Sequence, residues 1–254
     1  MGRSTQRASK QAAEWPRRIE DALARDRFAL YTQPIVDIET GQVLRHELFL
    51  RMVEDDAVIP AGDFMTAAEE HGSIRDIDRW VVGAAIDVAA RGYPVHVNLS
   101  VRSLDRELLA LICTKLADTG ARASDVTFEL SERQLVDAGK EELEFVKVVS
   151  AMGCELALDQ FIQGGHRYGL LRRFPLAYVK IGPPFITDLP HDTAGARMIE
   201  RVAMRTHRFG EKLIAQGVED IVTLQILQDI GVDQVQGHAL GAPAPLDPAT
   251  GAPA

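Results

Sequence analysis

Polar side chains stand at or near the ends of successive apolar runs along this chain. They are Glu47, Asn98, Glu129, Asp159, Lys180, Gln216 and Gln236. Any one of them alone could be an ordinary surface residue at a strand end. If the runs are strands of one sheet and their carboxyl-terminal ends meet, three carboxylates and an amide oxygen lie close together there. Such oxygen ligands suit Mg²⁺ or Mn²⁺. Without a cation the clustered carboxylates would repel and raise each other's pKa.

Eight short runs rich in apolar and β-branched residues carry these side chains and predict buried strands. They are residues 28–36, 43–52, 95–100, 126–131, 155–161, 177–182, 212–218 and 233–237. Helical spacing of apolar residues predicts helices between them, over 63–72, 78–92, 105–120, 141–153, 193–210 and 221–231. Several of these helical segments end in Gly just before the next strand, which is a common stop signal.

Strand–helix alternation repeated this often is typical of a parallel sheet covered by helices, and about eight strands favour a closed barrel. Closure brings the strand ends into one ring. The first two runs are joined only by residues 37–42, which leave no room for a helix and indicate a hairpin. The expected fold is therefore α/β, a modified TIM-type (β/α)8 barrel with an N-terminal β-hairpin start.

Composition predicts a single domain over residues 14–246, flanked by polar or Pro/Gly/Ala-rich flexible tails at 1–13 and 247–254. The net charge of -9 argues against general nucleic-acid binding and against an anionic-membrane binder, because both need excess Lys and Arg. The N-terminal residues contain no apolar run that predicts a signal peptide or a membrane span, so a cytoplasmic location is expected.

Cysteine and histidine usage predicts no further site. Cys113 and Cys154 stand in apolar surroundings and are expected to be buried, reduced thiols. The seven histidines show no zinc-binding spacing, so we assign them no role.

Seven blocks in order give the chain a recognisable pattern. They are YTQPIVDIETGQVLRHELFLR, VHVNLSVRSL, VTFELSER, LALDQF, YVKIG, LIAQGVE and VQGHALGAP. Over roughly residues 16 to 245 the chain resembles the EAL domains, the cyclic di-GMP phosphodiesterases. The family's Glu-Ala-Leu is here Glu47-Leu48-Phe49.

The resemblance implies roles for individual residues. Glu47, Asn98, Glu129 and Asp159 match residues that hold a first Mg²⁺ or Mn²⁺ in the family. Gln33, Arg51, Asp78 and Gln236 match or lie near positions lining the cyclic di-GMP site, with Arg51 on a phosphate. Lys180 matches the lysine of the family's Lys-Ile-Asp, a catalytic position.

The chain departs from the family around the second metal. Gln160 replaces the second Asp of Asp-Asp-Phe, Gly182 replaces the Asp of Lys-Ile-Asp, and Gln216 replaces a catalytically important Glu. An amide carries no charge and cannot take a proton from water, so these changes predict weak binding of a second metal and loss of a base. Residues 161–165 also differ in a loop that the family uses for dimer coupling.

Three interpretations of the function remain open at this stage. The first is a catalytically degenerate EAL protein that binds cyclic di-GMP as a receptor or regulates a protein partner, with a homodimer as a further expectation. The alternative is an active metal-dependent phosphodiesterase that makes linear pGpG, with Glu219 or Glu132 supplying a replacement carboxylate. An unrelated metal-dependent barrel hydrolase is the third and remotest interpretation.

Overall fold

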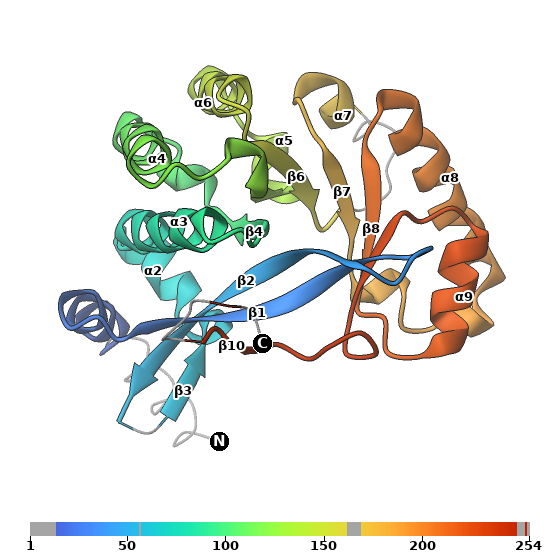
Figure 1. The fold of residues 1–254 in the computed structure, drawn as a ribbon, viewed down its shortest axis with the longest axis horizontal. Helices are drawn as coiled ribbons and strands as arrows, with labels where there is room; N and C mark the ends of the chain where they lie inside the picture. The colour runs from blue at the N-terminus through green and yellow to red at the C-terminus, as the bar shows by residue number, and fades with distance from the viewer. Residues whose placement is uncertain (1–13, 56, 162–168, 248–251, 253–254) are drawn as a thin grey trace, which may run out of the picture.

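A closed barrel of strands surrounded by helices forms the centre of the molecule in the computed structural model (Figure 1). The structure describes residues 14–55, 57–161, 169–247 and 252. The strands are β1 (Phe28–Asp37), β2 (Val43–Glu54), β3 (Ala57–Pro60), β4 (Val95–Asn98), β5 (Val126–Ser131), β6 (Glu155–Asp159), β7 (Tyr178–Ile181), β8 (Lys212–Gln216), β9 (Gln234–Gln236) and β10 (Ala244–Pro245).

The helices lie outside this barrel. They are a helix over residues 14–24, α2 (Met65–His71), α3 (Ile74–Ala90), α4 (Arg106–Thr119), α5 (Glu132–Val136), α6 (Lys140–Ala151), α7 (Gly169–Arg173), α8 (Thr193–Phe209) and α9 (Ile221–Asp229). Left-handed glycines follow α2, α4 and α8, as expected from the sequence. No helix among the described residues is long and apolar enough to cross a membrane.

Strand pairing confirms the predicted barrel with its hairpin start. Neighbouring strands from β2 through β4 to β9 run parallel, and β1 pairs antiparallel with both β2 and β9, which closes the ring. The turn between β1 and β2 is fixed by Asp37, whose Oδ1 accepts hydrogen bonds from the backbone N and the hydroxyl of Thr40. Beyond the barrel, β2 continues into a hairpin with β3, and β10 pairs with β1.

Two apolar cores follow from the alternation of side chains along the strands. The large core fills the space between the outer face of the barrel and the helices. A small cluster of Ile35, Ala157, Tyr178 and Ile214 fills the barrel interior. Each member lies two positions from a predicted site residue on its strand, so this layer supports the polar ring directly above it.

Some elements differ from the sequence-based expectation. The segments α5, α7, β3 and β10 were not predicted, and all four are too short to show a clear period. Helix α3 begins at Ile74 rather than at residue 78. Of the predicted tails, only Asp247 and Ala252 fall within the described residues, and the altered loop residues 162–165 lie outside them.

The prediction of two buried thiols is wrong for one of them. Cys154 is buried before β6, whereas Cys113 is exposed on α4, with its Sγ 3.2 Å from Sδ of Met152. The apolar neighbours of Cys113 in sequence face the core, because helical residues next to each other point about 100° apart.

Candidate functional site

The predicted polar residues come together at the end of the barrel where the parallel strands finish. The side chains of Glu47, Glu129, Asp159, Lys180 and Gln236 are all buried there, with Glu47 only 3 % and Lys180 0 % exposed. Each comes from a different strand, and strand pairing aligns Asn98 with Glu129 and Gln216 with Gln236. Barrel closure thus gathers the residues that the sequence places at separate strand ends.

Lys180 occupies the centre of this ring. Its Nζ donates to Oε2 of Glu47 at 2.6 Å and to Oε1 of Glu129 at 2.5 Å. With the Gln216 amide oriented to satisfy its neighbours, the amide oxygen accepts from Lys180 Nζ at 3.1 Å. An ammonium group has three N–H donors, so these partners satisfy all of them.

Amide side chains bridge the carboxylates of the ring. The Nδ2 of Asn98 donates to Oε1 of Glu47 at 2.9 Å. The amide nitrogen of Gln216, in the same orientation, donates to Oδ1 of Asp159 at 3.2 Å. Gln216 therefore links Asp159 to Lys180 as a neutral group, at a place where a carboxylate would add negative charge.

Burial and crowding shift the pKa values of the ring. Burial and the nearby charge of Glu47 raise the pKa of Glu129 to about 7, and burial raises that of Asp159 to about 7. Burial would also raise the pKa of Glu47, but the ammonium of Lys180 outweighs it and holds that pKa below its usual value. For Lys180 itself burial is outweighed by Glu129 and Glu47, and its pKa is raised.

His96 also belongs to this network, although its position in the sequence predicted no role for it. Its ring is fully buried in β4, and Nδ1 lies 2.7 Å from Oε1 of Glu129. The signal available in the sequence was its position two residues before Asn98, which places both side chains on the same face of the strand. This contact joins His96 to the polar residues of the mouth through the carboxylate of Glu129.

A hollow of about 480 Å³ opens directly above the ring. Glu47, Asn98, Asp159 and Gln216 line it together with the backbone-strained Gln160, whose φ is 53°. Phe49 and the segment Gly182–Phe185 complete its walls. An adjoining hollow of about 680 Å³ shares Asn98, Asp159 and Gln160 and reaches Glu129 and Asp78.

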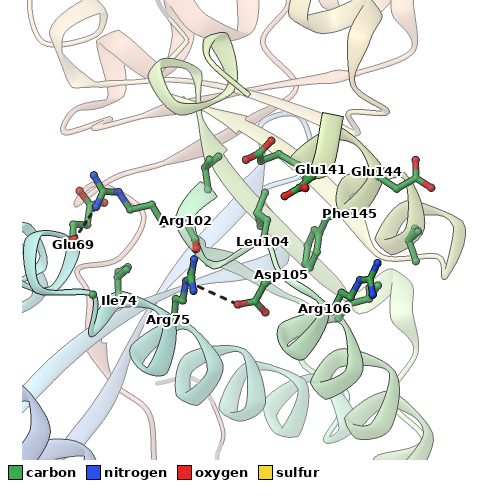
Figure 2. A pocket seen from close by; sticks show the side chains of 15 residues that line it. Glu69, Ile74, Arg75, Arg102, Leu104, Asp105, Arg106, Glu141, Glu144 and Phe145 are labelled. Atoms are coloured by element: carbon green, nitrogen blue, oxygen red, sulfur yellow. Dashed lines mark hydrogen bonds and ion pairs between the residues drawn. The ribbon is translucent and has the colours of Figure 1, made fainter. Parts of the chain in front are cut away.

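A larger hollow, of about 980 Å³, lies outside the barrel among α3, α4 and α6 (Figure 2). Arg75 and Arg106 line it together with Glu141 and Glu144, whereas Arg102 extends towards Glu69 and donates to its carbonyl. None of the residues predicted to hold metal or nucleotide lines it. We therefore assign the candidate site to the barrel mouth, where the buried carboxylates and the ammonium converge.

The predicted ligand residues lie at the mouth in different ways. Gln33 stands opposite Glu47 in the β1–β2 register, and its Nε2 donates to the carbonyl of Gly241 at 2.9 Å. Arg51 is four residues beyond Glu47 on the same face of β2, with its guanidinium over the rings of Tyr31 and Phe49. Gln236 adjoins Glu47 and helps hold down the pKa of that carboxyl.

Two further predicted residues are less directly placed. Asp78 is 2 % exposed, lies beside the adjoining hollow and accepts a hydrogen bond from the backbone N of Ser100 at 3.0 Å. Burial raises the pKa of Asp78 to about 7. Glu219 is exposed on the loop after β8. Their assignments to ligand and catalysis stay predictions.

The donor chemistry of the ring fits one hard divalent cation. Glu47, Asn98, Glu129 and Asp159 offer oxygen ligands, and Oε2 of Glu129 is buried without a hydrogen-bond partner. In the part of the chain that the structure describes, no three His, Cys, Asp or Glu side chains form a ready-made metal cage. The ammonium of Lys180 lies between two of the carboxylates, so ion binding would share them with it.

Comparison with known proteins agrees with this architecture. The EAL domain model matches residues 16–243. The chain is 30% identical over 237 residues to the uncharacterized protein y4lL of Sinorhizobium fredii, covering 91% of this chain and 28% of that protein. It is 27% identical over 246 residues to the cyclic di-GMP phosphodiesterase PdeB of Shewanella oneidensis, covering 93% and 29%. This chain thus spans less than a third of either relative.

A solved structure shows the same fold. The FimX EAL domain of Xanthomonas citri, in complex with c-diGMP, superposes with a TM-score of 0.88 at 26% identity, covering 95% of this chain and 97% of that domain. The match over residues 16–243, the barrel with its antiparallel first strand and the polar ring at its mouth together show that this chain belongs to the EAL domain family.

Proposed function

We propose that this chain is a catalytically degenerate member of cyclic di-GMP signalling that binds the dinucleotide without hydrolysing it and acts on a protein partner. EAL domains are typically metal-dependent cyclic di-GMP phosphodiesterases. Binding and hydrolysis make different demands on such a site. The barrel mouth of this chain retains the residues suited to one cation and to the ligand, but it lacks the negative charge for a second cation and the base that hydrolysis needs.

The observation that carries the proposal is the Gln216 bridge between Asp159 and Lys180. Two-metal hydrolysis of a phosphodiester needs a cation on each side of the phosphorus and a water that loses a proton. At the mouth, three carboxylates face one ammonium, which leaves at most enough negative charge for one divalent cation. Gln160 and Gln216 add none, and Gly182 offers no side chain.

Ligand binding is supported by the β1–β2 ribbon at the mouth. Arg51 lies with its guanidinium against Tyr31 and Phe49, and its Nη1 donates to the carbonyl of Leu50 at 2.9 Å, so a phosphate would be bound by its other N–H groups. Gln33 stands opposite Glu47 on the same ribbon and is fixed by its hydrogen bond to the carbonyl of Gly241. The FimX EAL domain, which shares this architecture, is in complex with c-diGMP.

Calorimetric titration with cyclic di-GMP tests the binding half of the proposal. We expect saturable binding by the natural chain and a loss of at least about tenfold in affinity for Arg51→Ala, because a charged bidentate contact is removed. Arg91→Ala is the matched control, since Arg91 is exposed at the end of α3, away from the mouth. Absence of binding, or equal binding by both variants, would contradict the receptor role.

Restoring the lost charges tests the catalytic half. Gln216→Glu would place a second carboxylate where the amide nitrogen now lies 3.2 Å from Asp159 Oδ1. Such a pair repels unless a cation or proton lies between its members. We expect Gln160→Asp combined with Gln216→Glu to gain thermal stabilisation by Mn²⁺ and to gain hydrolysis. No gain in either property would refute the charge-deficit explanation.

A working phosphodiesterase is the alternative function. It is favoured by the retained Glu47, Asn98, Glu129, Asp159 and Lys180 and by the likeness to PdeB. It would need a substitute for the missing carboxylates. Glu219 is exposed after β8, and Glu132 is 1 % exposed at the start of α5, so recruiting either requires local rearrangement.

A further inference from the structure

Helix α8 carries a line of arginines on its outward face. Its inner face packs Ile199, Val202, Ala203 and Thr206 against the barrel. Arg197, Arg201, Arg205 and Arg208 are separated by four, four and three residues, which places them on one side of the helix, opposite the buried face. All four are exposed, and α8 forms the outer edge of the molecule in Figure 1.

Several arginines elsewhere in the described part of the chain are paired with carboxylates. Arg18 pairs with Glu54, Arg45 with Glu155, and Arg79 with Asp105. By contrast, Arg197, Arg201 and Arg208 make no ion pair or hydrogen bond with any residue that the structure describes. The helix has one carboxylate, Glu200, which is also exposed. Among the described residues, Arg197, Arg201 and Arg208 therefore form an unneutralised positive surface on a chain whose net charge is -9.

The residue types on this face are those of protein interfaces. Met204 is 63% exposed among the arginines, and Phe209, which points about 100° away from Arg208 at the end of the helix, is also 46% exposed. No lysine occurs between Thr193 and Phe209. Arg, Met and aromatic residues are enriched in protein–protein contacts, whereas Lys is depleted there. A surface that served only solubility would not require Arg and Met in place of Lys.

We propose that the outward face of α8 binds an acidic segment of a partner protein, with carboxylates on Arg197, Arg201 and Arg208 and an apolar side chain against Met204. Guanidinium groups pair with carboxylates in bidentate geometry. From Arg197 to Arg208 the helix rises about 16 Å, so a short segment covers the whole line.

The acidic remainder of the chain favours a short segment over a larger anion. A membrane surface or a nucleic-acid duplex would extend beyond α8 over a protein with a net charge of -9 and would meet repulsion there. In addition, the apolar face of α8 is packed inside the protein and is not available to enter a bilayer. The inference does not depend on nucleotide chemistry, because the residues concerned lie outside the barrel mouth.

Fluorescence anisotropy with a labelled peptide of about 14 residues, carrying glutamates at helical spacing around one leucine, tests the proposal. The test variant is Arg197→Glu/Arg201→Glu/Arg208→Glu. The control is Arg17→Glu/Arg91→Glu/Arg106→Glu, which changes the net charge equally at other exposed arginines, two in helices and one directly after α3. We expect the natural chain and the control to bind at low salt. We expect the test variant to bind at least about 30-fold more weakly, and about 0.3 M salt to weaken the natural chain's binding.

Several outcomes would overturn the inference. They are no binding of the peptide, equal weakening in both triple variants, or binding of the natural chain to phosphatidylserine vesicles or duplex DNA in preference to the peptide. Unfolding of the test variant is controlled by Arg197→Gln/Arg201→Gln/Arg208→Gln, which removes charge without reversing it and is expected to lose peptide affinity as well. Titration of the test variant with cyclic di-GMP is expected to be unchanged, which keeps this result separate from the proposed function.

Discussion

Replacing Lys180 by methionine tests the electrostatics of the barrel mouth. The side chain of Lys180 is 0 % exposed, and its ammonium lies 2.6 Å from Glu47 and 2.5 Å from Glu129. Methionine fills a similar volume and removes the charge. Two buried carboxylates then remain without their shared cation, and an uncompensated buried charge is strongly unfavourable.

The size of the effect follows from these contacts. Breaking a buried ion pair by removing one partner destabilises a protein by about 3–5 kcal/mol. In this protein, proton uptake by Glu129 limits the loss of stability, because burial raises the pKa of that carboxyl to about 7 even with Lys180 in place. At pH 7.5 we therefore expect Lys180→Met to lower the free energy of unfolding by about 3 kcal/mol.

The loss is also expected to depend on pH. Without the ammonium, the pKa of Glu129 in the folded chain rises further above its value in the unfolded chain. The pKa of Glu47 also rises, because the contact that holds it below its usual value is lost. A carboxyl with a raised folded pKa lowers stability as pH increases towards that pKa. The difference between the variant and the natural chain should thus shrink by about half between pH 7.5 and pH 5.5.

Urea denaturation followed by circular dichroism gives the free energies. The matched control is Lys115→Met, which breaks an ion pair with Asp87 whose partners are 33% and 44% exposed and should lose at most about 1 kcal/mol. A loss for Lys180→Met no larger than that of the control would refute the reasoning, and so would a loss that grows at lower pH.

Three other predictions concern residues outside the Lys180 network. Glu211 is 3 % exposed, and burial raises its pKa from 4.5 to about 8, so the free energy of unfolding falls as pH rises through this window. Glu211→Gln should remove up to about 5 kcal/mol of that fall, which denaturation between pH 4 and pH 9 measures. A maleimide reagent should label exposed Cys113 and leave Cys154 intact, since burial raises the pKa of the Cys154 thiol to about 12; mass spectrometry would show equal labelling if this is wrong. A Cβ at Gly237 would collide with the backbone of Val218, so Gly237→Ala should destabilise by about 2 kcal/mol or more, and an unchanged melting temperature would contradict the packing.

Much of the fold could be predicted because the chain has strong local signals. Short β-branched runs alternate with helices that end in glycine, and this order leaves few topologies besides a barrel. The site residues were predictable for a related reason. Asn98, Glu129 and Asp159 stand near the ends of apolar runs and Glu47 lies within one, and closure of a barrel brings such positions into one ring.

Interactions between distant residues were beyond the reach of sequence patterns. The sequence shows a lysine at the end of one strand, but only the closed barrel places its Nζ between Glu47 and Glu129. The role of His96 was missed because an alternating strand pattern does not tell which carboxylate faces an inward residue. The exposure of Cys113 depends on the helix rotation that tertiary packing selects. The short strand β3 was missed because its four residues carry no period.

The turnover of cyclic di-GMP by the natural chain tests the central claim most directly. The purified chain is incubated with cyclic di-GMP and Mn²⁺, and the products are separated by chromatography, with the Gln160→Asp/Gln216→Glu variant in parallel. The deficit of negative charge at the mouth predicts that the natural chain leaves the cyclic dinucleotide intact. Steady formation of linear pGpG by the natural chain would contradict it.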